Sequence, residues 1–286
     1  MSGWWEERAG LAGQVAVITG GAGGLGEAVT RDLAANGVRV AVLDIDGAAV
    51  ERTGAELGTD AIAAQGDARD PDQLAALFAA VDERWGRLDI LVNVPGGTFR
   101  APFTETRPKG WDTLIRTNLT HVLHACSLAV PRMQAGGRGG SIVNITTIEC
   151  HRAAPGFAVY SAAKAGVEQF ARSLAVELAP DRIRVNNVAP DYTPTPAMLA
   201  ISNGAAGAGV GAAPGIGISI PMGRAGVVTD ISGCVVFLAS GLSSYVTGQT
   251  LHPDGGTYAS GGWFNWPEHG WSVSVPADVV RLLPGQ

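Results

Sequence analysis

Three side chains that could move a proton occur within one short stretch, TTIECHRAAPGFAVYSAAK at 146–164. Tyr160 and Lys164 are four residues apart, so they share a face if the stretch is helical, and the Thr147 hydroxyl lies thirteen residues before the tyrosine. A free tyrosine titrates near pH 10, and a neighbouring ammonium group lowers that pKa because it stabilises the phenolate. The spacing indicates a tyrosine acid/base, whereas YxxxK in isolation more often marks an exposed tyrosine and a solvated lysine.

A glycine-rich turn, TGGAGGLG at 19–26, stands between a predicted strand and a predicted helix. Gly20, Gly24 and Gly26 have the spacing of a turn whose backbone approaches a pyrophosphate. The start of the following helix supplies free N–H groups and a favourable dipole for the phosphates. The sequence therefore predicts a dinucleotide site at this turn.

Two aspartates follow the turn at the ends of predicted strands. Asp44 lies eighteen residues after Gly26, where a carboxylate accepts from both ribose hydroxyls and repels a 2′-phosphate, which favours NAD over NADP. The alternative is that Asp44 or Asp46 caps the next helix. Asp67, in QGDARD, either accepts a hydrogen bond from the adenine edge or caps the helix after it.

Short β-branched runs alternate with longer Ala/Leu-rich helical patterns along nearly the whole chain. The predicted strands are 14–19, 38–44, 60–67, 88–94, 141–146, 182–189 and 248–252. The predicted helices are 24–36, 47–57, 71–85, 110–134, 158–179 and 229–240. This alternation predicts a single α/β domain, residues 1–286, with a doubly wound parallel sheet and helices on both of its faces.

Composition narrows the classes of partner. Of the 286 residues, 46% are hydrophobic and 16% are charged, which is typical of a globular protein. The net charge is −6 and no stretch concentrates Lys and Arg, so nucleic acid and anionic membrane surfaces are poor partners. No apolar run approaches the roughly 18 residues of a membrane span. Cys126, Cys150 and Cys234 are odd in number and far apart, which favours reduced thiols in the cytoplasm and no metal site.

Together these motifs resemble the compact single-domain form of the short-chain dehydrogenase/reductase family over about residues 12–258. The set comprises, in chain order, the turn TGxxxGxG, Asp67, NVPGG at 93–97, Asn118, the Thr147 hydroxyl, YxxxK and the stretch 190–195. The resemblance implies a Rossmann-type fold. It also implies hydride transfer between a nicotinamide cofactor and a secondary alcohol or ketone.

The resemblance assigns roles to particular residues. Tyr160 would be the general acid/base, and Lys164 would lower its pKa and bind the nicotinamide ribose. Thr147 would stand in place of the usual serine, and Asn118 would help to hold a water for proton relay through the lysine. The cofactor-binding positions implied in the same way are Gly20, Gly24, Leu25, Gly26, Asp44, Asp67, Ala68, Asn93, Gly96, Tyr160, Lys164, Pro190, Thr193 and Thr195.

Three residues depart from the family's pattern. The extra methyl group of Thr147 narrows the pocket and restricts χ1 relative to serine. Pro95, in the NVPGG loop, has no N–H and so removes one local hydrogen-bond donor. Asp191 replaces the glycine that the family has after Pro190, and its carboxylate would either contact a polar group of the substrate or face solvent.

Several other polar residues have competing interpretations. His121 and His124 could bind a metal, but no further ligands are suggested nearby, so we expect them to pack at a subunit contact. Cys150 and His151 could form a nucleophilic pair, but adjacent side chains usually point in different directions. We expect Glu149 and His151 to line the substrate cavity instead.

Two segments fall outside the regular pattern. The segment 196–222 is rich in Gly and Ala and lies where the family carries its substrate-covering region, so we expect a mobile cover over an apolar substrate. The alternative for this segment is a disordered surface loop. The tail, about 259–286, carries three of the seven tryptophans, and it either covers a neighbouring subunit's cleft or packs on its own subunit.

These observations predict an NAD-dependent oxidoreductase that interconverts an apolar or cyclic secondary alcohol and its ketone in the cytoplasm. The resemblance to the family implies a homotetramer. One alternative is a 3-oxoacyl thioester reductase, which would more naturally use NADPH. Another is a dinucleotide-binding regulatory protein with weak catalysis, which the departures at Thr147 and Asp191 keep open.

Overall fold

Seven parallel strands form the centre of the protein in the computed structural model, which describes residues 3–195 and 215–282. Their order across the sheet is β3-β2-β1-β4-β5-β6-β7. The strands are β1 (Val15–Thr19), β2 (Arg39–Asp44), β3 (Ile62–Gln65), β4 (Ile90–Asn93), β5 (Gly140–Ile145), β6 (Ile183–Val188) and β7 (Thr250–Leu251). The order reverses between β1 and β4, and open α/β sheets bind their ligands beyond the strand ends at such a point.

The α-helices alternate with these strands, as the sequence predicts. They are α1 (Trp4–Ala9), α2 (Gly24–Ala35), α3 (Gly47–Leu57), α4 (Pro71–Trp85), α5 (Pro108–Ile115), α6 (His121–Gly136), α7 (Ala158–Leu178), α9 (Ile216–Ser219), α10 (Val228–Ala239), α11 (Thr257–Ser260) and α12 (Ala277–Val280). The helix predicted over 110–134 is a continuous helical stretch, 108–136, but a π-helical turn, Arg116–Thr120, divides it into α5 and α6. Single π-helical turns of this kind occur within α-helices, frequently at functional sites.

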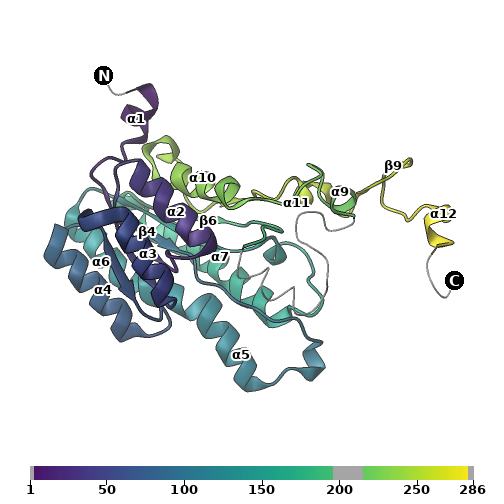
Figure 1. The fold of residues 1–286 in the computed structure, drawn as a ribbon, viewed down its shortest axis with the longest axis horizontal. Coiled ribbons are helices and arrows are strands. Elements are labelled where there is room, and N and C mark those ends of the chain that lie inside the picture. The colour runs from purple at the N-terminus through teal and green to yellow at the C-terminus, as the bar shows by residue number, and fades with distance from the viewer. Residues whose placement is uncertain (1–2, 196–214, 283–286) are drawn as a thin grey trace.

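Both faces of the sheet are covered by helices, and each face has its own apolar core (Figure 1). Side chains alternate along β1, so that Val15 and Val17 pack with α4, α6 and α7, whereas Ala16 and Ile18 pack with α2, α3 and α10. Burial on both sides explains why the strand sequences are continuously apolar. The predicted α/β architecture is therefore confirmed.

A row of polar side chains crosses the sheet near the carboxyl ends of five strands. Thr19 on β1 donates to the side chain of Asn93 on β4 (3.4 Å), and Asn93 donates to Asn144 on β5 (2.9 Å). The row continues from Asn144 to Asn187 on β6 (3.1 Å) and from Asn187 to Thr250 on β7 (3.2 Å). Each pair stands side by side in the strand register. We call these five residues the asparagine row.

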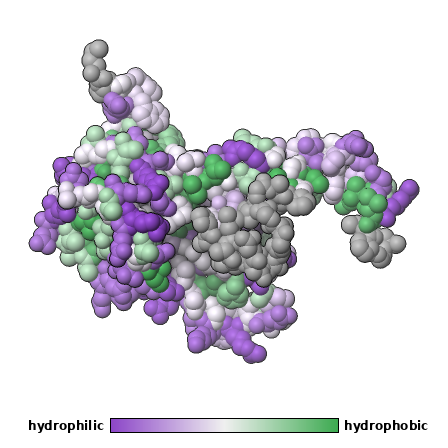
Figure 2. All heavy atoms as spheres, viewed as in Figure 1, coloured by the Kyte–Doolittle hydropathy of each residue, from purple (hydrophilic) through white to green (hydrophobic). Residues whose placement is uncertain are grey.

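The C-terminal arm, which begins at α11, extends away from the sheet (Figure 1). It contains a two-stranded antiparallel sheet made of β8 (Phe264–Trp266) and β9 (Gly270–Ser272), and β8 packs beside α9. Trp263 and Trp271 are about half exposed, and hydrophobic residues lie among hydrophilic ones on the arm (Figure 2). The described part of the arm contacts α9 of its own subunit, and its covering of a neighbouring subunit stays a prediction.

Candidate active site

A cleft of about 830 Å³ opens at the carboxyl ends of the central strands. It brings together eight of the site residues expected from the sequence, namely Leu25, Gly96, Thr147, Tyr160, Lys164, Pro190, Thr193 and Thr195. Residues that the sequence did not single out also line it, namely Val94, Thr98, Ile145, Thr146, Arg152, Phe157, Tyr192 and Thr257. Gly215, Ile216, Ser219 and Ile220 line it as well, and they belong to the expected covering segment. Most of the expected segment 196–222 lies outside the described residues, and its described part contains α9, which contributes Ile216 and Ser219.

The predicted proton-transfer group is assembled on one wall of this cleft. Thr147 follows β5 and caps a short 3₁₀ turn, Ile148–Cys150, accepting a hydrogen bond from the Glu149 N–H at 3.3 Å. Burial raises the pKa of Tyr160 to about 12, and a hydrogen bond with the Thr147 hydroxyl opposes part of that rise. The two side chains are thus neighbours, as their spacing predicted.

Lys164, one turn after Tyr160 on α7, is buried. Its ammonium donates to the carbonyl oxygens of Ile145 (2.8 Å) and Pro95 (3.2 Å). Burial is the largest influence on the pKa of Tyr160 in this arrangement. The lowering of that pKa by Lys164 together with a bound nicotinamide stays a prediction.

The buried cation gives a pH-dependent prediction. Burial lowers the pKa of Lys164 to about 8, from 10.5 in an unfolded chain. Below pH 8 the lysine is protonated in both the folded and the unfolded state, and the folded state bears the full free-energy cost of the buried charge. Above pH 8 the unfolded chain binds more protons than the folded protein, so the free energy of unfolding rises with pH. Relative to Lys164→Met, the parent should gain about 2–3 kcal/mol in free energy of unfolding between about pH 7 and pH 10. Urea unfolding at both pH values measures this gain, and a difference that is independent of pH would contradict it.

Asn118 lies in the π-helical turn and fixes the NVPGG loop. Its Nδ2 donates to the carbonyl oxygens of Gly97 (2.8 Å) and Leu114 (2.9 Å), and its Oδ1 accepts from the Gly97 N–H (3.2 Å). The loop is therefore held although Pro95 lacks an N–H. A role for Asn118 in holding a water stays a prediction, because its side chain is used by these three hydrogen bonds.

The glycine turn has the geometry that a pyrophosphate requires. Gly20 adopts a positive φ of 66°, and a Cβ atom at Gly26 would overlap the carbonyl oxygen of Gly20. Because these positions have no side chains, the main chain of the turn is open to a ligand. The first N–H groups of α2 face the same edge of the sheet. These residues fit the phosphates of a dinucleotide.

The expected helix cap is Asp46, whereas the contact of Asp44 to a ribose stays a prediction. Asp46 caps α3 by accepting from the Ala49 N–H at 3.1 Å. Asp44 instead accepts from the Ala22 N–H in the glycine turn at 3.0 Å, and it also accepts from the Asp46 N–H. The carboxylate of Asp44 is thus placed beside the phosphate turn, where a ribose would lie.

Asp67 does not cap the following helix, because Asp70 occupies that position and accepts from the N–H groups of Asp72 and Gln73. The carboxylate of Asp67 pairs with the guanidinium of Arg69 at 2.7 Å, and this hydrogen-bonded partner lowers the pKa of the aspartate. Asp67 lines a separate cavity of about 350 Å³, and its contact to adenine stays a prediction, as does that of the buried Ala68.

Asp191 is paired with another side chain and does not simply face solvent, and its contact to a polar group of the substrate stays a prediction. Its carboxylate accepts from the guanidinium of Arg152 at 3.0 Å, and Arg152 also pairs with Glu149 at 2.9 Å. All three side chains line the cleft, which confirms that Glu149 lies there. Arg152 carried no sequence signal, since its partner Asp191 follows 39 residues later in the chain.

One expectation outside the cleft needs correction. His121 is 1% exposed within its own chain, so its ring packs inside the subunit and not at a subunit contact, and this burial lowers its pKa to about 3. The side-chain amide of Asn93 is used within the asparagine row, and a contact of this residue to a cofactor stays a prediction. Among the described residues, no cluster of His, Cys, Asp and Glu is arranged to hold a metal ion.

The Cys150–His151 pair is not a nucleophilic site. Burial raises the pKa of the Cys150 thiol to about 12, so the thiol stays protonated near neutral pH. His151 does not activate it, because the Nε2 atom of His151 lies 3.0 Å from the carboxylate of Glu168.

In the parts of the chain that the structure covers, no helix combines the length and the apolarity needed to cross a bilayer.

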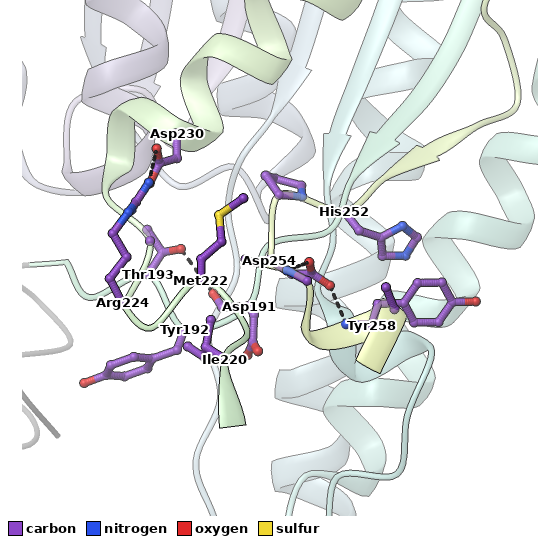
Figure 3. A pocket seen from close by; sticks show the side chains of 15 residues that line it. Asp191, Tyr192, Thr193, Ile220, Met222, Arg224, Asp230, His252, Asp254 and Tyr258 are labelled. Atoms are coloured by element: carbon purple, nitrogen blue, oxygen red, sulfur yellow. Dashed lines mark hydrogen bonds and ion pairs between the residues drawn. The ribbon is translucent and has the colours of Figure 1, made fainter. Parts of the chain in front are cut away.

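A second cavity of about 480 Å³ adjoins the cleft and shares with it the residues Asp191, Tyr192, Thr193 and Ile220. Figure 3 shows it bounded by the segment 191–193, the start of α10 and the segment 252–258. His252 and Tyr258 lie side by side on one of its walls, with ring centroids 4.4 Å apart.

Comparison with known proteins agrees with this geometry. A family model described as enoyl-(acyl carrier protein) reductase matches residues 20–258. The chain is 35% identical over 251 residues to the 3-oxoacyl-[acyl-carrier-protein] reductase FabG of Escherichia coli, covering 86% of this chain and 98% of the relative. It is 36% identical over 250 residues to nodulation protein G of Azospirillum brasilense, covering 86% and 98%.

Solved structures give the same answer. A short-chain type dehydrogenase/reductase from Mycobacterium marinum superimposes with a TM-score of 0.78 at 29% identity, covering 86% of this chain and 96% of the other. The 3-ketoacyl-(acyl-carrier-protein) reductase from Brucella melitensis complexed with NADH superimposes with a TM-score of 0.77 at 30% identity, covering 87% and 99%. The chain therefore belongs to the short-chain dehydrogenase/reductase family and is a nicotinamide-dependent oxidoreductase acting on CH–OH donors.

Proposed function

We propose that the chain reduces 3-oxoacyl thioesters to 3-hydroxyacyl thioesters, with NADH as the hydride donor. The observation that carries the proposal is the arrangement of Thr147, Tyr160 and Lys164 on the wall of a cleft in a chain whose relatives are 3-oxoacyl-[acyl-carrier-protein] reductases. The names of these relatives favour the thioester over the apolar or cyclic ketone expected from the sequence. A homotetramer and a cytoplasmic location stay predictions on which this reaction does not depend.

The residues of the cleft account for the proton half of the reaction. When bound, the cofactor supplies hydride to the carbonyl carbon. Thr147 donates a hydrogen bond to the carbonyl oxygen, and Tyr160 transfers its proton to that oxygen as the C–H bond forms. The ammonium of Lys164 stabilises the phenolate that remains.

The proposal is tested by following NADH consumption with acetoacetyl-coenzyme A and, separately, with cyclohexanone. We expect turnover of the thioester with a kcat/KM at least 10-fold above that of the cyclic ketone. The reverse preference would contradict the thioester assignment and would instead support the apolar ketone. Repeating both assays with NADPH then measures the cofactor preference.

The preference for NADH is assigned to Asp44. A carboxylate that accepts charge-assisted hydrogen bonds from ribose hydroxyls contributes about 1.5–3 kcal/mol, so Asp44→Ala should raise the KM for NADH roughly 10- to 100-fold. The same change should improve NADPH use, because a negative charge no longer faces the 2′-phosphate. Steady-state kinetics with both cofactors measure the ratio.

Asp46→Ala is the matched control for this prediction. Asp46 follows Asp44 by two residues and caps α3. Loss of this cap should lower the free energy of unfolding by about 1 kcal/mol. It should leave the NADH/NADPH ratio unchanged. An Asp44→Ala variant that keeps the parent's ratio would rule out this contact to the ribose.

A further inference from the structure

A buried carboxylate lies beside the catalytic pair and takes no part in the chemistry described above. Glu168 follows Lys164 by four residues and Tyr160 by eight, so all three lie along one face of α7. The side chain of Glu168 is 3% exposed. A carboxylate removed from water at this depth requires hydrogen-bonding or charged partners.

The close partners of Glu168 belong to the segment that carries Thr147, and they include the Cys150 thiol, which is hydrogen-bonded to the carboxylate. The Thr146 hydroxyl donates to Oε1 at 2.8 Å, and the Nε2 atom of His151 lies 3.0 Å from Oε2. These two residues flank the 3₁₀ turn that Thr147 caps. Arg172, on the next turn of α7, is more distant at 3.9 Å and half exposed.

Further contacts hold the same segment. The His151 ring packs edge-on against His252 at 4.5 Å between centroids, and His252 stacks on Tyr258 (Figure 3). Lys164 donates to the carbonyl oxygen of Ile145 immediately before the segment. Residues 145–151 are therefore attached to α7 at both ends, with Thr147 between the two attachments.

We propose that Glu168 is a positioning residue that aims the Thr147 hydroxyl at the substrate oxygen by holding Thr146 and His151. The proposal rests on the role of Thr147 in the proposed function. A carboxylate suits this task because it can accept from the hydroxyl and from the imidazole at the same time. Its place on α7 fixes the hydroxyl relative to Tyr160, which the same helix carries.

Glu168→Gln is the primary test, because the amide keeps the volume but loses one acceptor oxygen. Displacement of a catalytic group by about 1 Å can cost about 10²-fold in rate, so we expect kcat to fall by this order. The dissociation constant for NADH, measured by fluorescence, should stay within about 2-fold, since none of the moved groups belongs to the phosphate turn. The exposed Glu177 on the same helix provides the matched control, Glu177→Gln, which should leave both values unchanged.

A double-mutant cycle with Thr147→Ala separates positioning from general disruption. If Glu168 acts through the Thr147 hydroxyl, then Glu168→Gln should cost little in the Thr147→Ala background, and the two losses should not add. Additive losses would overturn the positioning role while leaving Thr147 in its assigned place. If Thr147→Ala alone keeps the parent's kcat, the role of Thr147 in the proposed function fails, and this proposal fails with it.

Thr146→Val keeps the test decisive if Glu168→Gln does not fold. It removes one donor to the carboxylate with almost no change in shape, and thermal unfolding reports whether the fold is retained. The same cycle with Thr147→Ala should again show losses that do not add. A folded Thr146→Val variant with the parent's kcat would overturn the proposal.

Discussion

Replacing Tyr160 by phenylalanine is expected to lower kcat on the order of 10³-fold, because a positioned general acid typically contributes 10²–10⁴-fold. The ring that lines the cleft is kept, so packing against the substrate should change little. Only the proton donor is lost, and the carbonyl oxygen would have to take its proton from water. Stopped-flow and steady-state measurement of NADH oxidation, with NADH affinity measured separately, would test this expectation.

The control for this prediction is Tyr245→Phe, at a fully exposed tyrosine. It should keep the parent's kcat and KM. A Tyr160→Phe variant as fast as the parent would remove Tyr160 from the chemistry, and the acid would then have to be sought elsewhere in the cleft.

Replacing Gly26 by alanine should abolish dinucleotide binding and destabilise the fold. The added Cβ would overlap the carbonyl oxygen of Gly20, which is a main-chain atom and cannot move aside as a flexible side chain does. Overpacking of this kind costs about 1–3 kcal/mol or more, and any relief must open the phosphate turn itself. Urea unfolding and NADH fluorescence titration give the two measurements.

Gly23→Ala is the matched control from the same turn. A Cβ there meets nothing within 4 Å, and its φ of −133° suits any residue. Stability and NADH affinity should therefore stay close to those of the parent. Equal behaviour of the two alanine variants would contradict the close backbone approach at Gly26.

The element boundaries could be predicted wherever local residues end an element. The predicted bounds of α3 and α4 agree with the structure because their caps lie in adjacent sequence: Asp46 and Gly58 for α3, Asp70 and Gly86 for α4. The π-helical turn at Arg116–Thr120 was not predicted, because its residues, RTNLT, include no Gly or Pro that would mark an irregularity in a helix. Its consequence, an Asn118 side chain turned towards the NVPGG loop, was hidden for the same reason.

In the candidate site, likewise, residues that are near in sequence could be placed together and residues that are distant in sequence could not. Thr147, Tyr160 and Lys164 could be placed together because strand, turn and helix connect them within eighteen residues. The pairing of Arg152 with Asp191 joins two loops that are distant in sequence, and that of His151 with Glu168 joins a turn to a helix. Such pairs follow from tertiary packing, so residue spacing alone does not reveal them.

Substrate class was the least predictable property. The expectation of an apolar or cyclic ketone relied on the composition of 196–222, and the apolar side chains of a covering segment do not report the reacting group of the substrate. The named relatives point instead to a thioester. The same relatives do not decide the choice of cofactor, which Asp44 bears on directly.

The asparagine row has a consequence for how the sheet is assembled. The side-chain amide of each inner member donates a hydrogen bond to one neighbour and accepts one from the other. Adjacent strands are therefore aligned by specific hydrogen bonds as well as by packing. A strand that slid along its neighbour by one position would bring these amides opposite aliphatic side chains and leave them without partners in a dry interior. The row therefore penalises misaligned strand pairing during folding and fixes the register of the five strands whose carboxyl ends carry the loops of the active site.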